Sequence, residues 1–149
     1  MLIYVCVSSH GYGHAARQAA VLIQLHRLHP DWHLVISSAV DELFLALVLG
    51  NVPVSRRSVR WDVGMLQADA LGVDQLATLH ALEQLNKNLP QLLRREVEWI
   101  QSQDRQVVVL ADIPPAAAEL AHRLNAPLVW MGNFGWDEIY APLGGAFLH

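Results

Sequence analysis

Short apolar runs alternate with amphipathic stretches along most of the 149-residue chain. The runs are almost continuously apolar, which is typical of parallel strands that are covered on both faces. The stretches between them carry apolar residues at steps of three and four, which predict helices. The expected strands are residues 2–7, 33–37, 52–61, 107–111 and 128–131, and the expected helices are residues 15–29, 40–49, 73–88, 90–102 and 115–124.

Strands that alternate with helices predict an open, Rossmann-like three-layer α/β domain with a mostly parallel sheet. The length is that of one domain, residues 1–149, and is enough to bury a sizeable core. Pro90 is expected either to kink a long helix or to begin a new one. Ligands on such sheets bind at the carboxyl ends of the strands, which selects the loops of residues 8–14, 37–41, 62–69, 112–115 and 132–137 as candidate sites.

The composition narrows the classes of partner. Hydrophobic residues make up 53% of the chain and charged residues 16%, so we expect apolar surface that is covered by a partner domain or by self-association into an oligomer. A net charge of −4 lacks the excess of basic residues that is typical of proteins that bind nucleic acid. The apolar runs predict neither a transmembrane segment nor a secretory signal, so a cytoplasmic protein is expected. Cys6 is expected to be a small buried residue.

The candidate chemistry is concentrated between the first strand and the first helix, in the segment SSHGYGHAAR of residues 8–17. Gly11 and Gly13 allow a sharp turn and a close approach of the backbone to a ligand. The helix behind them directs unpaired N–H groups and the positive end of its dipole toward the loop. This arrangement predicts a binding site for an anionic or polar ligand.

The same segment formally matches the dinucleotide-binding fingerprint, with alanine in the last position. The second predicted strand, however, ends in Ser37-Ser38 and lacks the acidic residue that would bind a ribose. Tyr12 and His14 also add bulk where a pyrophosphate should meet bare backbone. A dinucleotide site is therefore disfavoured.

His14 is the candidate general base, because its imidazole could accept a proton from a hydroxyl held over the loop. The alternative is a histidine that caps or pins the loop. His10 could take part or only shape the loop, and with no third ligand evident no metal site is expected. Arg17 could hold an anionic group or pair with a surface acid.

Asp112 follows a buried strand, where it could orient a histidine, contact a ligand or cap the next helix. Two further loops, residues 62–69 with Gly64 and residues 132–137, combine polar side chains with turn residues. Binding and plain turn chemistry are both open for their polar residues, and Trp136 could line a pocket or cover the sheet edge. The candidates in these loops are Asp62, Gln67, Asp69, Asn133, Trp136 and Asp137.

The loop of residues 9–17 resembles the amino-terminal signature of glycosyltransferases of the GT-B fold. The likeness is strongest to the glycosyltransferase-like amino-terminal region of L-arabinokinases and related bacterial proteins. The other matching pieces are ordered along nearly the whole chain, at residues 62–71, 96–100, 111–115 and 132–140.

In GT-B enzymes two Rossmann-like domains face each other across a cleft, with the acceptor mainly on the amino-terminal domain and the nucleotide-sugar donor mainly on the other. The resemblance implies that His14 is the base that deprotonates the acceptor hydroxyl and that Asp112 orients it. The candidate ligand-binding residues, taken from the loops at the carboxyl ends of the strands, are His10, Gly11, Tyr12, Gly13, Arg17, Gln67, Asp69, Asn133, Trp136 and Asp137.

Because the sequence stops at His149, we expect the donor domain to be absent from this chain. The expected function is then the acceptor-side half of a nucleotide-sugar-dependent transfer site, incomplete as an enzyme on its own. The expected partners are a sugar or glycoconjugate acceptor and a second GT-B domain or a second copy. No cofactor is expected, since a nucleotide sugar is a co-substrate. The alternatives are a non-catalytic sugar- or phosphate-binding module and a dinucleotide-binding domain.

Overall fold

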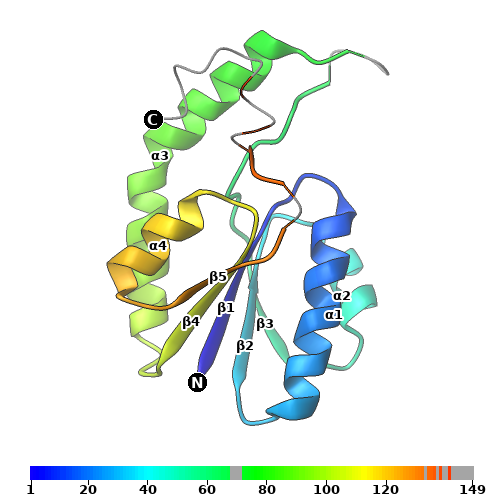
Figure 1. Cartoon of the computed structure of the whole chain (residues 1–149), viewed down its shortest axis with the longest axis vertical. Coiled ribbons are helices and arrows are strands. Elements are labelled where there is room, and N and C mark those ends of the chain that lie inside the picture. Colours follow the sequence, from blue (N-terminus) through cyan, green and yellow to red (C-terminus); the bar gives the residue numbers. More distant parts are fainter. Residues whose placement is uncertain (68–71, 133, 137, 139–140, 142–149) are drawn as a thin grey trace.

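Five parallel strands form one sheet at the centre of the chain (Figure 1). The computed structural model describes residues 1–67, 72–132, 134–136, 138 and 141. The order of the strands is β3-β2-β1-β4-β5, and each neighbouring pair is parallel. This confirms the predicted α/β class with a Rossmann-like three-layer arrangement. The strands are β1 (Leu2–Val7), β2 (His33–Ser37), β3 (Val54–Arg57), β4 (Val107–Asp112) and β5 (Leu128–Trp130).

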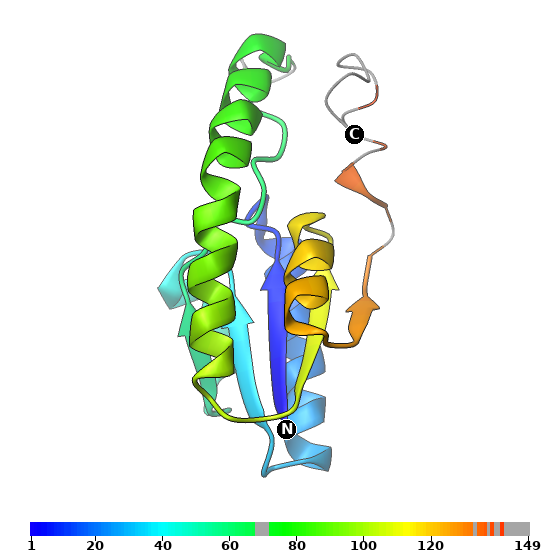
Figure 2. The same ribbon diagram turned by 90° about the vertical axis from the view of Figure 1, so that its left-hand side faces the viewer.

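The helices cover both faces of the sheet (Figures 1 and 2). One face packs against α1 (Tyr12–Leu28) and α2 (Glu42–Leu49), and the other packs against α3 (Gln75–Gln101) and α4 (Ala116–Leu124). Because successive side chains of a strand point to opposite faces, β1 contributes to both cores. Ile3, Val5 and Val7 lie in the core under α1 and α2, whereas Leu2, Tyr4 and Cys6 lie in the core under α3 and α4. Cys6 is buried and free, as predicted.

The first helix begins three residues earlier than predicted. Gly11 is its N-cap and has a φ of 80°, in the left-handed region that favours glycine. Gly13 therefore lies inside the first turn of α1, and only Gly11 makes the sharp turn that the sequence assigned to both glycines. The predicted helix of residues 40–49 begins two residues later, because the side chain of Asp41 accepts a hydrogen bond from Phe44 N and caps it.

The third predicted strand was wrong in extent. The strand expected over residues 52–61 is only Val54–Arg57, although Val59 and Trp61 beyond it are buried. Of the two outcomes expected at Pro90, the structure shows one long helix, α3, which includes the proline. The long helix keeps packing against the core through Leu93 and Ile100, both almost fully buried, which outweighs the single hydrogen bond that a proline removes.

The topology places two loops side by side. β1 has β2 on one side and β4 on the other, so the point where the strand order reverses lies between β1 and β4. At their carboxyl ends, Ser8 N donates a hydrogen bond to Asp112 O at 2.9 Å. The loop after β1 and the end of β4 therefore meet where ligands of open parallel sheets bind. None of the helices among the described residues is long and apolar enough to cross a membrane.

Candidate functional site

His14 and Asp112 form a hydrogen-bonded pair at the switch point of the sheet. The Nδ1 atom of His14, in the first turn of α1, lies 2.8 Å from Oδ1 of Asp112, the last residue of β4. The side chain of Asp112 is fully buried, whereas that of His14 is 11% exposed. The structure thus brings together the two residues that the resemblance pairs as base and orienter.

Asp112 accepts hydrogen bonds from two further residues of α1. Arg17 donates from Nε to Oδ2 at 2.8 Å and from a terminal nitrogen to Oδ1 at 2.6 Å, so its guanidinium makes a bidentate contact with both carboxylate oxygens. Gln18 donates from Nε2 to Oδ2 at 2.7 Å and is itself fully buried. Burial alone would raise the pKa of Asp112, but the hydrogen bonds from Arg17, Gln18 and His14 outweigh it and hold the pKa below its ordinary value. The carboxyl group is therefore an anion at neutral pH.

This arrangement decides between the readings that the sequence left open for Asp112 and Arg17. Asp112 does not cap the next helix, since Pro115 occupies the N-cap position of α4 and no side chain caps that helix. Arg17 pairs with an acid, but with a buried one rather than a surface one, and the hydrogen bonds to it raise the pKa of Arg17. Gln18 was missed by the sequence analysis. Its position four residues after His14, on the same helix face, was the available signal.

The chemistry of the pair follows from its hydrogen bonds. A carboxylate only accepts, so the His14 nitrogen that faces Asp112 carries a proton. The Nε2 atom of the neutral ring is then an acceptor, and none of the described residues hydrogen-bonds to it. A neutral imidazole held in this way can accept a proton from a bound hydroxyl group.

The loop glycines and Tyr12 lie next to His14 in the sequence, at the start of α1. A Cβ atom added at Gly11 or Gly13 would meet no atom within 4 Å, so the space above the first turn of α1 is open. The helix has no side-chain cap at its N-terminus. Tyr12 is 57% exposed, and its ring packs against Phe44 of α2 with the ring centroids 4.3 Å apart. Free backbone N–H groups therefore face solvent beside His14.

His10 lies on a second cluster, next to the pair. Its ring contacts the edge of Trp136, with the centroids 5.5 Å apart, and a Cβ atom on Gly64 would lie 2.2 Å from its Nδ1. Gly64 has a φ of 71°, so glycine is required there for its backbone as well as for the space. His10 is exposed, and the structure gives it a packing role in the loop.

Trp136 is almost fully buried and donates from Nε1 to Oδ2 of Asp62 at 2.7 Å. Asp62 is also buried, and no described residue donates a hydrogen bond to its Oδ1. Burial raises the pKa of Asp62, although the hydrogen bond from Trp136 and the nearby Ser8 and Ser9 partly offset the shift. Trp136 thus joins the loop after β3 to the segment after β5.

Trp136 also lines an open groove of about 510 Å³ beside the carboxyl ends of β4 and β5. Phe134 lines this groove, and its ring centroid lies 6.0 Å from that of His14. Trp136 therefore lines this groove and also packs against Ile113 and Phe134 in a small buried cluster. The lining is mostly apolar and includes Ile113, Pro115, Trp130, Met131, Phe134 and Trp136.

The remaining predicted ligand-binding residues are not brought to the pair by the described structure. Gln67 is exposed and forms an isolated bridge with Val73. Asp69, Asn133 and Asp137 lie outside the described residues.

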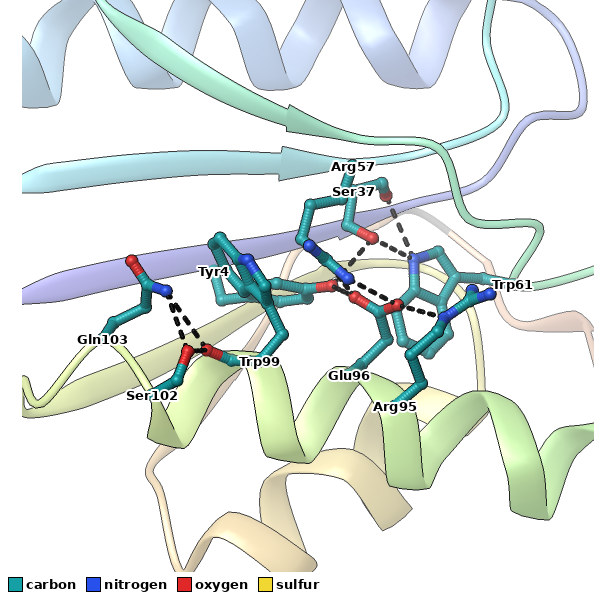
Figure 3. Close-up of polar contacts among 9 residues, drawn as sticks. All are labelled: Tyr4, Ser37, Arg57, Trp61, Arg95, Glu96, Trp99, Ser102 and Gln103. Carbon is teal, nitrogen blue, oxygen red and sulfur yellow. Dashed lines mark hydrogen bonds and ion pairs between the residues drawn. The ribbon is translucent and has the colours of Figure 1, made fainter.

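A second buried polar network lies on the opposite face of the sheet, between the sheet and α3 (Figure 3). Glu96 of α3 is fully buried and accepts hydrogen bonds from Tyr4 at 2.7 Å, from Arg95 at 3.1 Å and from both Nε and a terminal nitrogen of Arg57. The Arg57 guanidinium also lies over the Trp99 ring, 4.1 Å from its centroid. Burial opposes ionisation of Glu96, yet the hydrogen bonds from Arg57 and Tyr4 hold its pKa below the ordinary value.

This network ties β3 to α3 and does not reach the His14 pair. From the sequence, Arg57 was only a charged position within the predicted strand of residues 52–61. No local pattern shows that an arginine in a strand and a glutamate 39 residues later share one buried site.

The chain is similar to part of L-arabinokinase from Arabidopsis thaliana. The two sequences are 37% identical over 136 residues, which cover 91% of this chain and 13% of that protein. This supports the predicted resemblance at the level of L-arabinokinase, and the chain corresponds to a partial region of a much larger protein. No protein-family model matches the chain.

Proposed function

We propose that this chain acts in sugar metabolism, as the acceptor-side half of a nucleotide-sugar-dependent glycosyl transfer site. The observation that carries the proposal is the 2.8 Å contact between His14 and the buried Asp112 at the switch point of the sheet. The similarity to part of L-arabinokinase, a protein named for a sugar substrate, supports the sugar as ligand class.

In this proposal His14 is the general base. Its Nε2 takes the proton of an acceptor hydroxyl while the hydroxyl oxygen attacks the anomeric carbon of the donor, and the bond from that carbon to the nucleotide diphosphate breaks. Asp112 holds the ring and stabilises the imidazolium that forms. The donor is held by a second domain that faces the loop of residues 8–14, because a reaction of this kind needs both substrates enclosed away from water.

The test is transfer in a mixture of this chain, a separately expressed second domain and a panel of nucleotide sugars, read as release of nucleoside diphosphate that depends on an added sugar. His14→Ala is expected to abolish the release. His122→Ala is the matched control, because His122 is an exposed histidine on α4, and it is expected to have no effect. Transfer that survives His14→Ala would overturn the catalytic role.

A non-catalytic sugar- or phosphate-binding module is the second candidate. It is favoured by the uncapped N-terminus of α1, whose N–H groups can bind a phosphate without any base. Calorimetry with sugars, sugar phosphates and nucleotides separates the two candidates. Binding without transfer in the mixture supports the module, and binding of NAD or NADP alone supports a dinucleotide-binding domain.

A further inference from the structure

Arg17 contacts both members of the His14–Asp112 pair. Its terminal nitrogen lies 2.6 Å from Oδ1 of Asp112 and 3.2 Å from Nδ1 of His14, so it contacts both partners. A guanidinium only donates hydrogen bonds, and Nδ1 can either donate or accept. Two arrangements therefore compete at this position, and they differ in which ring nitrogen carries the proton.

In the first arrangement Nδ1 carries the proton and both groups donate to the same carboxylate oxygen. In the second, Nδ1 accepts from Arg17, and its lone pair then faces Oδ1 of Asp112 at 2.8 Å. An ionised Asp112 excludes the second arrangement, because two acceptors would repel each other at that distance. A protonated Asp112 would admit it, and Nε2 would then carry the proton and could not act as a base.

Asp112 stays ionised although its side chain is fully buried, and a buried carboxyl without a cation takes up a proton. The guanidinium supplies the only positive charge that the described residues place in contact with it. Gln18 supplies a neutral hydrogen bond to the same oxygen that Arg17 Nε contacts, so Gln18 stabilises the carboxylate without charge, whereas Arg17 supplies the charge together with two hydrogen bonds.

We infer that Arg17 is a positioning residue that fixes the neutral His14 ring with its proton on Nδ1 and its lone pair on Nε2, by keeping Asp112 ionised and its two oxygens in a fixed orientation. The inference rests on the proposed function, since it names the residue that prepares the base. The charged groups that face His14 are Arg17 from its own helix, Asp112 from β4 and Asp62 from the segment after β3.

The experiment is nuclear magnetic resonance of the 149-residue chain with ¹⁵N-labelled histidine, in which the shifts of the two ring nitrogens report the tautomer. His14→Gln assigns the signals among the eight histidines. The wild-type ring is expected to show the Nδ1–H pattern alone. Arg17→Met is expected to lose this single pattern and gain Nε2–H signal, and Arg17→Lys is expected to restore the wild-type pattern in part.

Gln18→Met is the matched control, because it removes a neutral donor to Asp112 and leaves the guanidinium in place. It is expected to keep the Nδ1–H pattern. An unchanged tautomer in Arg17→Met, or equal effects of Arg17→Met and Gln18→Met, would overturn the inference. If Arg17→Met does not fold, Arg17→Lys decides, because lysine keeps the positive charge but cannot contact both oxygens of Asp112 as the guanidinium does. Arg17→Lys is then expected to show a mixture of Nδ1–H and Nε2–H signals, and a pattern identical to that of the wild type would overturn the role of the guanidinium.

The readout needs neither donor nor acceptor, so it separates this inference from the proposed function. A missing Arg17 effect together with His14-dependent transfer would overturn the inference alone. An Arg17-dependent tautomer without any transfer would overturn the glycosyl-transfer proposal alone. Where transfer is measured, Arg17→Met is expected to lower kcat more than it changes KM, because Arg17 acts through Asp112.

Discussion

Nδ1 of His14 and Oδ1 of Asp112 are 2.8 Å apart although the two residues are separated by 98 positions in the chain. Two parallel strands, β1 and β4, bring them together, because the loop after β1 leads directly into α1 and Asp112 ends β4. The contact is thus a consequence of the sheet order.

Asp112→Asn is expected to lower the free energy of unfolding by roughly 1–3 kcal/mol, because it removes the anion that accepts from three residues and leaves donors of Arg17 or Gln18 unpaired in a buried place. Chemical denaturation at neutral pH measures the change. A variant as stable as the wild type would show that these hydrogen bonds make no net contribution to the free energy of unfolding.

Arg57→Met is expected to cost about 3–5 kcal/mol, because it leaves the fully buried Glu96 carboxylate without the cation that contacts both its oxygens. Arg56→Met is the control one position earlier. Arg56 pairs at 3.5 Å with Glu42, which is 84% exposed, and its loss is expected to cost about 0–1 kcal/mol. Similar urea midpoints for the two variants would contradict the structural role of the Glu96 network.

The acid side of the stability profile depends on the same network. The pKa of Glu96 is lower in the folded chain than its ordinary value of 4.5, so the ionised group stabilises the fold above that pH and the contribution is lost as the pH falls through the folded pKa. Unfolding free energies measured from neutral pH downward are expected to fall steeply below pH 4.5. Glu96→Gln is expected to be less stable at neutral pH and to show a shallower fall, and a parallel curve would argue against the shift.

Two glycines in the site carry opposite expectations. Gly64→Ala places a Cβ atom 2.2 Å from the His10 ring at a φ of 71°, and is expected to destabilise the chain by about 1–3 kcal/mol. Gly13→Ala lies in the first turn of α1 with free space around it and is expected to stabilise it by about 0.5–1 kcal/mol. The midpoints of thermal unfolding of the two variants and of the wild type measure both effects. A stabilised Gly13→Ala that binds ligand less well would show that the open space serves a ligand.

The fold class followed from the sequence because the apolar runs of parallel strands are continuous and the helices between them are amphipathic. The ends of elements were less predictable. Gly11 caps α1 because of its backbone angle, which the periodicity of the sequence does not show. Pro90 lies inside a long helix that packs against the core on both sides of the proline, so local periodicity could not show that the helix continues through it.

The candidate site was predicted in part. His14 and Asp112 were found from their places after predicted strands, and the structure shows them in contact. Arg17 was a candidate from the sequence, but its buried partner, like the part played by Gln18, required the three-dimensional structure, because only the pairing of β1 with β4 shows that one buried carboxylate accepts from both. The Asp62–Trp136 hydrogen bond joins segments 74 positions apart and has no local signal.

The central claim is that an acceptor sugar binds over the first turn of α1 with its hydroxyl at Nε2 of His14. The most direct test is titration of the ¹⁵N-histidine-labelled chain with neutral sugars, followed by sugar phosphates and nucleotides. A saturable shift of the His14 Nε2 signal with a sugar, and no shift at His122, is the predicted result. No shift at His14 with any sugar, or shifts confined to residues away from the loop of residues 8–14, would contradict it.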